Sequence, residues 1–376
     1  MAAADLAATR AALLHAVARG RVPPPAPVVR AQPASSVLRP EAAATLAGLH
    51  IEELQLCTEI LIDDGGDSNG LQAWVPLRLA KLPPAEAPQE QEALPAVLLL
   101  HATGVDKDSL AARQAEFARR GYLAAALDCR YHGERADPAL AGGEGYQQAL
   151  VRAWRGSGER PFLLDNVWDI LRTLDYLQAR PDVDAARIGL TGVSLGGMHT
   201  WLAAAVDERV AAAAPMIGVQ YFGWAVRESL YHARVESIPL VFQAAAADLA
   251  LQLSAAAAAR QQPPGSSCSG DVTPEVVTAV WNVLLPGMLE VWDAPYSLPL
   301  LAPRPLLIAN GQLDPRCPMQ GLELALESVR AAYSSLGAPD LFQLYVEPGC
   351  GHECTEGMWQ QVFAFMDRHL LRSQQA

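Results

Sequence analysis

Short apolar runs alternate with longer amphipathic stretches over most of this chain. The runs PAVLLLH (95–101), YLAAALD (122–128) and RIGLTGV (187–193) are apolar almost throughout, a pattern typical of strands that are buried on both faces of a sheet. Residues 161–180 place apolar side chains at spacings of three and four, which predicts a helix. Strands that alternate with helices predict a doubly wound, mostly parallel α/β fold.

The same alternation continues toward the C-terminus. Further strands are predicted at 210–219, 304–311 and 341–349, and further helices at 108–121, 195–206, 322–337 and 356–371. The alanines of VAAAAPMIGV (210–219) leave a helix open at that strand. Before the alternation begins, two extended runs at 53–62 and 71–80 flank DDGGDSNG, a stretch dense in turn formers, and therefore predict a hairpin.

Two parts of the chain depart from the alternation. Residues 1–50 are predicted to form an N-terminal helix, within 6–21, and a Pro-rich connector that includes VPPPAPVV. The remainder, 51–376, is predicted to be the main domain. Within it, 219–300 shows no strand–helix alternation, and its segments 235–260 and 276–292 are predicted to be helical around an exposed loop, QQPPGSSCSG. Because insertions after a strand's C-terminal end overhang the ligand crevice, we interpret 219–300 as a helical cap.

Composition and charge narrow the class of protein. The chain has 376 residues, 51% of them hydrophobic, and a formal net charge of −13, which indicates a globular protein and argues against nucleic-acid or anionic-membrane partners. No apolar run approaches the roughly 18 to 20 residues of a membrane span. The six cysteines have no framework spacing, so a reducing compartment, the cytoplasm, is expected. The Ala-, Arg- and Pro-rich first 45 residues leave a plastid transit peptide as the alternative.

A candidate nucleophile lies between a predicted strand and a predicted helix. Gly192-Val193-Ser194-Leu195-Gly196 is a G-x-S-x-G pattern in the strand–turn–helix setting that the nucleophile elbow requires. The glycines would let strand and helix approach closely, and Ser194 would lie beside the N-terminus of the helix, which favours negative charge. The alternative is an ordinary tight turn.

A serine hydroxyl needs a base, and the base needs an acid to orient it. In this setting the chain order is nucleophile, acid, histidine. Asp314 follows the strand predicted at 304–311, and His352 follows the last predicted strand, so both lie at the same edge of the sheet as Ser194. The other histidines considered are His101, His132, His199, His232 and His369.

The remaining site residues follow from that arrangement. The backbone N–H of Leu195 is expected to stabilise an oxyanion together with that of Thr103, with Ala102 as the alternative to Thr103. Candidate substrate-binding residues are His101, Tyr221, Trp224 and Arg130. Arg130 lies in DCRYHGERA, where an ion-paired structural loop is the other interpretation.

No motif requires a metal or another cofactor. GLTGVSLGG (189–197) fits neither a dinucleotide fingerprint nor a P-loop. The spacing of Cys350, His352 and Cys354 matches no common zinc pattern. A reversible disulfide among Cys317, Cys350 and Cys354, which would displace His352, is a further hypothesis that rests only on their proximity in the sequence.

Taken together, HATG, DCRYHGERA, GVSLGGMHTW, IGVQYFGW, DPRCP and GCGHE resemble a family of plant and algal α/β-hydrolases. That family is related to dienelactone hydrolase, acetyl xylan esterase and the catalytic domain of prolyl oligopeptidase. The similarity extends over nearly the whole chain, from the N-terminal helix onward, which implies that this helix belongs to the mature protein. The resemblance implies an α/β-hydrolase fold with a Ser-His-Asp triad, and names no substrate.

The sequence therefore predicts a serine hydrolase that cleaves a small carboxylic ester through an acyl-enzyme. Ser194 would attack, His352 would relay the proton and Asp314 would orient the imidazole. The apolar cap, including Tyr221, Trp224 and the segment 281–296, would select an apolar acyl or alcohol group. The alternatives are a peptidase of the prolyl-oligopeptidase type and a non-catalytic ligand receptor on a hydrolase fold. The acyl and alcohol groups and the oligomeric state are not specified by these patterns.

Overall fold

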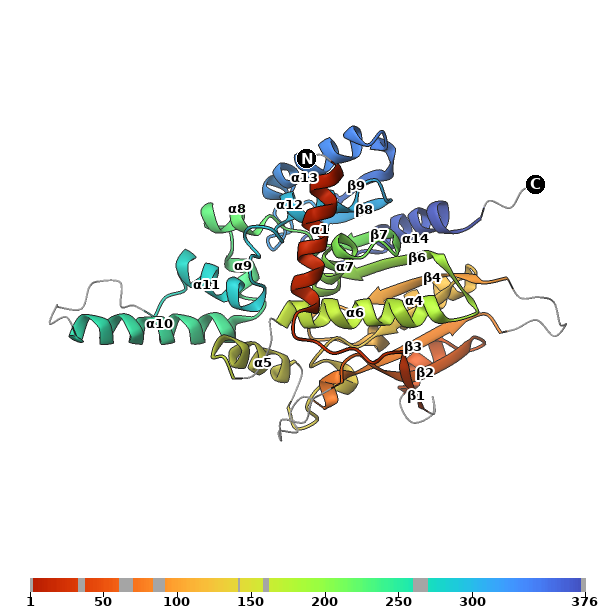
Figure 1. Cartoon of the computed structure of the whole chain (residues 1–376), viewed down its shortest axis with the longest axis horizontal. Helices are drawn as coiled ribbons and strands as arrows, with labels where there is room; N and C mark the ends of the chain where they lie inside the picture. Colours follow the sequence, from red (N-terminus) through yellow and green to blue (C-terminus); the bar gives the residue numbers. More distant parts are fainter. Residues whose placement is uncertain are drawn as a thin grey trace.

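The computed structural model describes residues 3–32, 38–60, 70–83, 92–140, 143–157, 162–259 and 270–372. The loops predicted at 63–70 and 261–270 fall almost entirely outside the described residues, as does Cys268. A nine-stranded sheet runs through the molecule in the order β1-β2-β3-β5-β4-β6-β7-β8-β9 (Figure 1). The first three strands pair antiparallel, and the strands from β5 to β9 pair parallel.

The strand bounds, from β2 onward, follow the extended runs predicted from the sequence. They are β1 (Val28–Gln32), β2 (His50–Cys57), β3 (Trp74–Lys81), β4 (Leu94–Leu100), β5 (Leu123–Leu127), β6 (Val183–Val193), β7 (Val210–Met216), β8 (Leu306–Gly311) and β9 (Phe342–Glu347). The predicted hairpin is the antiparallel pair β2–β3, and the alanine-rich run at 210–219 is a strand, β7, rather than a helix.

Strand β4 shows why these runs are apolar throughout. Its side chains point alternately to the two faces of the sheet: Leu98 and Leu100 enter one core cluster and Val97 and Leu99 the other. All four are completely buried. A strand with a core on each side has no polar face, so the period-two pattern disappears from its sequence.

Helices cover both faces of the sheet (Figure 1). Helices α1 (Ala3–Ala18), α6 (Phe162–Ala179) and α7 (Leu195–Val206) pack together on one face, where α7 contacts β4, β6 and β7. Helices α4 (Ala111–Arg119) and α14 (Glu356–Leu370) pack on the other face. A short helix, α3 (Pro40–Thr45), contacts α4, and α13 (Met319–Ser335) links β8 to β9.

The described part of 219–300 is helical and lies between β7 and β8 in the chain. It contains α8 (Phe222–Arg227), α9 (His232–Val235), α10 (Pro239–Ala259), α11 (Pro274–Leu284) and α12 (Ala294–Ser297). Helix α10 extends away from the sheet (Figure 1). The helix predicted over 276–292 is wrong in its second half, because α11 ends at Leu284, just before Pro286 and Gly287.

Among the described α-helices and strands outside 219–300, three were not predicted from the sequence: β1, α3 and α5. The Pro-rich connector contains the edge strand β1, which pairs with β2 directly after its prolines end. The stretch after β5, where no helix was predicted before residue 161, contains α5 (Glu144–Trp154). This helix packs against α10 and α11, so its apolar face is covered by a segment almost a hundred residues later in the chain.

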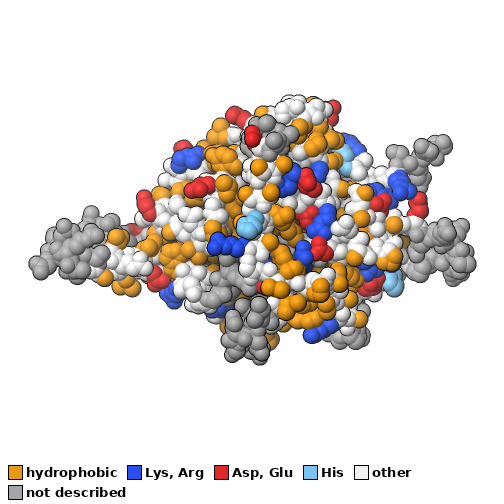
Figure 2. All heavy atoms as spheres, viewed as in Figure 1, with side chains coloured by type: hydrophobic (Ala, Val, Ile, Leu, Met, Phe, Trp, Pro, Cys, Tyr) orange, Lys and Arg blue, Asp and Glu red, His pale blue; other side chains and the backbone are white. Residues whose placement is uncertain are grey.

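Charged side chains of both signs are mixed on one face of the molecule (Figure 2). On the face seen in Figure 2, acidic and basic side chains are interspersed among apolar ones. Among the described residues, no helix is both long enough and apolar enough to cross a membrane.

Candidate active site

Ser194 lies at the sharp turn between β6 and α7. Its backbone has φ 54° and ψ −108°, a conformation that L-residues rarely adopt and that places the residue at a strained position. The turn is held from both sides, because the Ser194 N–H donates to the Met216 carbonyl (2.9 Å) and the Met198 N–H donates to the Ser194 carbonyl (2.8 Å). The structure therefore has the elbow geometry that the G-x-S-x-G pattern predicts.

The glycines of the elbow are required by close backbone contacts. A Cβ on Gly196 would lie 2.2 Å from the Leu100 carbonyl oxygen, and a Cβ on Gly192 would lie 2.5 Å from the Gly196 carbonyl carbon. Real Cβ atoms do not approach backbone atoms this closely. The start of α7 can therefore press against the end of β4 only because these positions lack side chains.

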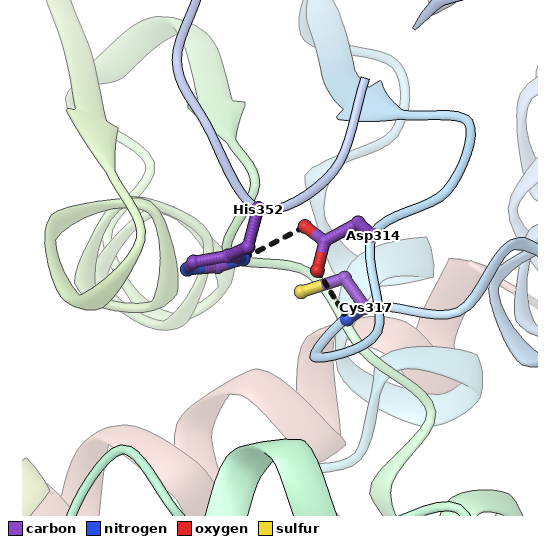
Figure 3. Close-up of side chains that lie close together, drawn as sticks. All are labelled: Asp314, Cys317 and His352. Atoms are coloured by element: carbon purple, nitrogen blue, oxygen red, sulfur yellow. Dashed lines mark hydrogen bonds and ion pairs between the residues drawn. The ribbon is translucent and has the colours of Figure 1, made fainter. Parts of the chain in front are cut away.

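The three residues predicted to form a triad lie in one hydrogen-bonded row. The distance from Ser194 Oγ to His352 Nε2 is 2.8 Å, and that from His352 Nδ1 to Asp314 Oδ2 is also 2.8 Å. Asp314 comes from the loop after β8 and His352 from the loop after β9 (Figure 3). Since the Asp314 carboxylate accepts a hydrogen bond from Nδ1–H, the neutral imidazole has an unprotonated Nε2 that can accept the Ser194 hydroxyl proton.

Asp314 is held firmly in this position. Its Oδ1 accepts the backbone N–H groups of Arg316 (2.8 Å) and Cys317 (3.0 Å), and its side chain is completely buried. The loop is also tied to the His352 loop, because the Leu313 N–H donates to the Cys350 carbonyl (2.7 Å). With Oδ1 occupied by two donors, Oδ2 is left to face the imidazole.

The environment keeps His352 neutral. Burial lowers the pKa of His352 below its ordinary value, against the Asp314 carboxylate, which raises it; Arg234 and Arg316 lower it further. A neutral imidazole at neutral pH is the form that can act as a general base. The His352 side chain is 12% exposed, so its imidazole is accessible from solvent.

The other histidines considered do not enter this row. His101 is fully buried, with Nδ1 bonded to the Ala102 carbonyl (2.8 Å) and Nε2 to the Cys129 N–H (3.0 Å). Burial lowers the pKa of His132 and of His199 to about 3. His232 bonds the Ser229 carbonyl, and His369 packs on Phe365.

A narrow cavity of about 20 Å³ lies beside the elbow. Both expected oxyanion residues, Thr103 and Leu195, contribute to its wall. The other lining residues come from α5, α6, α7, α9 and α11 and from the turn between α9 and α10: Tyr146, Leu150, Leu163, Met198, Arg234, Ser237, Ile238, Trp281 and Leu284.

Four residues expected to bind substrate do not line this cavity. Arg130 is buried in ion pairs with Asp165 and Asp169. Trp224 lies against Gly321 on α13, where a Cβ would be 2.3 Å from the indole. Tyr221 accepts a hydrogen bond from Arg227 (3.4 Å), and His101 is buried as described above. Of the expected cap residues, those of segment 281–296 that reach the cavity are Trp281 and Leu284.

The cysteines near the site are free thiols. Cys317, Cys350 and Cys354 form no disulfide, and burial raises the pKa of Cys317 and of Cys354 to about 12. Asp314, Cys317 and His352 each place one potential ligand atom within 4.8 Å of the others (Figure 3). A metal there would need a thiolate, which this burial opposes, and would take His352 away from Ser194.

Arg234 is a residue of this site that the sequence did not single out. It lies on α9, it is 6% exposed, and it joins the cavity wall to the turn that holds Asp314. Its Nη2 donates to the Cys317 thiol (3.3 Å) and to the Arg316 carbonyl (3.4 Å). No motif precedes or follows Arg234 in the sequence, so only the packing of the inserted helices reveals its position.

Part of the chain is similar in sequence to known hydrolases. Residues 85–262, just under half of the chain, match the model of the dienelactone hydrolase family, one of the families to which the sequence motifs indicate a relationship. This range includes Ser194, whereas Asp314 and His352 lie beyond it. A Bacillus subtilis (strain 168) protein named "Putative hydrolase YtaP" is 24% identical over 204 residues, which are 54% of this chain and 53% of that protein. The chain thus matches about half the length of this curated relative.

Solved structures show the same fold over almost the whole chain. Acetyl xylan esterase 1 from Thermoanaerobacterium sp. JW/SL YS485 has a TM-score of 0.58 at 16% identity, covering 98% of this chain and 94% of its own. An acetyl xylan esterase from Paenibacillus sp. R4 has a TM-score of 0.57 at 18% identity, with coverage of 97% and 95%. A glucuronoyl esterase from Solibacter usitatus has a TM-score of 0.56 at 17% identity, with coverage of 96% and 91%. The chain has the α/β-hydrolase fold, which confirms the predicted fold class.

Proposed function

We propose that this protein is a serine hydrolase that cleaves a small carboxylic ester through an acyl-enzyme intermediate. The observation that carries the proposal is the unbroken row from Ser194 Oγ through His352 to Asp314, with both distances at 2.8 Å. The family match and the esterases among the structural neighbours agree with this chemistry.

The mechanism follows from a neutral His352 between the Ser194 hydroxyl and the Asp314 carboxylate. His352 takes the hydroxyl proton as Ser194 Oγ bonds to the ester carbonyl carbon, and Asp314 stabilises the imidazolium that forms. The imidazolium then protonates the departing alkoxide, which leaves as the alcohol. The acyl group remains bonded to Ser194 Oγ. A water molecule, deprotonated by the same imidazole, attacks the acyl-enzyme and releases the carboxylic acid.

Two backbone amides are proposed to stabilise the tetrahedral oxyanion. The N–H of Leu195 is at the first turn of α7, where the helix dipole favours negative charge. The N–H of Thr103 follows β4, the strand next to β6, and both residues border the same cavity. Removal of one such donor typically costs about 3 to 4 kcal/mol of transition-state stabilisation.

The narrow cavity favours a short acyl group. Its walls are formed largely by Leu150, Leu163, Met198, Trp281 and Leu284, and about 20 Å³ leaves little space for a long chain. We propose that the inserted helices of 219–300 act as the cap that sets this limit. The kcat/KM for p-nitrophenyl esters should therefore fall from acetate to octanoate.

Turnover of these esters by the wild type and by Ser194→Ala tests the proposal. We expect release of p-nitrophenol by the wild type and no release above background by the variant. A folded wild type that turns over none of the esters would favour a ligand receptor instead. Cleavage of the p-nitroanilides of the same acyl groups with equal kcat/KM would favour the peptidase alternative.

A further inference from the structure

Arg234 differs from every other buried arginine in the described part of the chain. The other four form ion pairs with buried carboxylates: Arg21 with Asp165, Arg78 with Glu53, and both Arg130 and Arg135 with Asp169. Arg234 is as deeply buried, yet no carboxylate of the described residues forms an ion pair with it. A buried charge without a partner is costly, so this arrangement needs an explanation.

The hydrogen bonds of Arg234 leave part of the guanidinium free. Nε donates to Gln220 (3.1 Å), and Nη2 donates to the Cys317 thiol and the Arg316 carbonyl. All three acceptors are neutral, and Nη1 has no hydrogen-bond partner among the described residues. The guanidinium also packs near the Phe222 ring, with 5.7 Å to its centroid. These contacts fix the position of the cation without neutralising its charge.

This cation lies in the wall of the cavity that contains the two expected oxyanion residues. The rest of the lining is mostly apolar, which strengthens any ion pair formed there. We propose that Arg234 is a specificity-determining residue that binds a carboxylate carried by the ester substrate. The inference rests on the proposed function, because it concerns the substrate of the same site.

A carboxylate is the anion that suits this site best. Guanidinium groups bind planar carboxylates in a defined geometry, and the narrow cavity disfavours a bulkier, doubly charged phosphate. The carboxylate could belong to either side of the ester: to an acyl group derived from a short dicarboxylic acid, or to the alcohol that leaves. Both sources share the same recognition chemistry at Arg234, and substrates that differ in this respect distinguish them.

Two pairs of esters test the proposal, each with one anionic member and one neutral member of the same shape. Monoethyl malonate and ethyl 3-methylbutanoate place the difference in the acyl group, and 4-acetoxybenzoate and 4-isopropylphenyl acetate place it in the leaving group. Acid release is followed by titration for the wild type, Arg234→Met and Arg234→Lys. The matched control is Arg155→Gln, which removes an exposed cation that pairs with Asp248 and does not line the cavity.

We expect the wild type to prefer the anionic member of one pair. On that ester, Arg234→Met should lower kcat/KM by at least about 30-fold, which corresponds to about 2 kcal/mol, while kcat/KM for the neutral member changes by less than about threefold. Arg234→Lys should retain part of the preference, and Arg155→Gln all of it. If Arg234→Met lowers kcat/KM for both members equally, or if the wild type prefers neither anion, Arg234 has only a structural role.

Binding to an inactive variant separates this proposal from the proposed function. Calorimetry on Ser194→Ala should detect monoethyl malonate or 4-acetoxybenzoate, and the additional change Arg234→Met should abolish that binding. Binding that depends on Arg234, with no turnover by the wild type, would refute the hydrolase and support the carboxylate site. Turnover of neutral esters, with no binding that depends on Arg234, would support the hydrolase and refute the carboxylate site.

Discussion

The substitution Asp314→Asn tests how the hydrogen bonds around His352 determine its reactivity. In the native site Oδ1 accepts two backbone N–H groups, and Oδ2 faces His352 Nδ1 at 2.8 Å. An asparagine of nearly the same shape must keep its single oxygen toward the two N–H donors. Its NH₂ group then points at Nδ1, which can only accept.

The consequence is the wrong tautomer of the base. With Nδ1 as acceptor, the imidazole proton moves to Nε2, which faces the Ser194 hydroxyl and can no longer take its proton. The loss of an acid in this role lowers kcat by about 10⁴-fold, equivalent to about 5.5 kcal/mol of barrier. The free energy of unfolding should change by less than about 1 kcal/mol, since both backbone hydrogen bonds remain.

Steady-state hydrolysis of p-nitrophenyl acetate measures this loss, and denaturant unfolding measures the stability. Asp340→Asn is the matched control, because it makes the same change at an exposed carboxylate near the start of β9. The control should keep its full activity. If Asp314→Asn retains more than about a tenth of wild-type kcat while folded, the hydrogen-bonded row does not perform the chemistry assigned to it.

Three further predictions concern the elbow, the pH dependence and the inserted helices. Gly196→Ala places a Cβ 2.2 Å from the Leu100 carbonyl oxygen, so thermal unfolding should show a loss of at least about 2 kcal/mol and esterase activity should fall; Gly270→Ala, which meets nothing within 4 Å, should leave both unchanged. The groups that act on His352 are Asp314, which raises its pKa, and Arg234 and Arg316, which add to the lowering by burial. Because the base must be neutral and its pKa is lowered, kcat/KM should rise with pH to half its maximum below about pH 6.5, and a midpoint above pH 7 would contradict this. Asp293 accepts backbone N–H groups of Phe222, Gly223 and Ala294, so Asp293→Ala should lower the midpoint of unfolding by the equivalent of about 1 to 3 kcal/mol and weaken acyl-chain selectivity in the p-nitrophenyl ester series.

The sheet and the hydrogen-bonded row could be predicted because their signals are local. Each strand from β4 to β9 is a short apolar run, and parallel strands bring their C-terminal ends to one edge. Ser194, Asp314 and His352 follow three such ends in a fixed chain order, so their meeting needs no knowledge of side-chain packing. The strain at Ser194 was likewise indicated by its flanking glycines.

The cavity could not be predicted in the same way. Its lining combines Tyr146 on α5, Arg234 on α9 and Trp281 on α11, and the contacts between these helices are set by tertiary packing rather than by any repeat. Tyr221 and Trp224 belong to the segment predicted to be an apolar cap, but Trp224 packs against α13 and Tyr221 accepts a hydrogen bond from Arg227. Arg234 has no motif around it, and only its burial without a carboxylate distinguishes it.

Arg130 illustrates a related limit. An arginine in a loop after a strand is a natural candidate for binding an anionic substrate, and the sequence alone left that role open beside an ion-paired one. In the fold the carboxylates Asp165 and Asp169, one turn apart on α6, form ion pairs with it. The acidic partners lie more than 30 residues away in the chain, so the sequence could not show whether Arg130 is held in ion pairs or is available to a ligand.

The most direct test of the central claim is to locate a covalent adduct. The wild type would be treated with a fluorophosphonate, and the intact mass and the peptide map would be measured beside Ser194→Ala and Asp314→Asn. We expect one adduct per chain, on Ser194, no adduct on Ser194→Ala, and much slower labelling of Asp314→Asn. A folded wild type that stays unlabelled, or an adduct on any other residue, would contradict the assignment of Ser194 as the nucleophile.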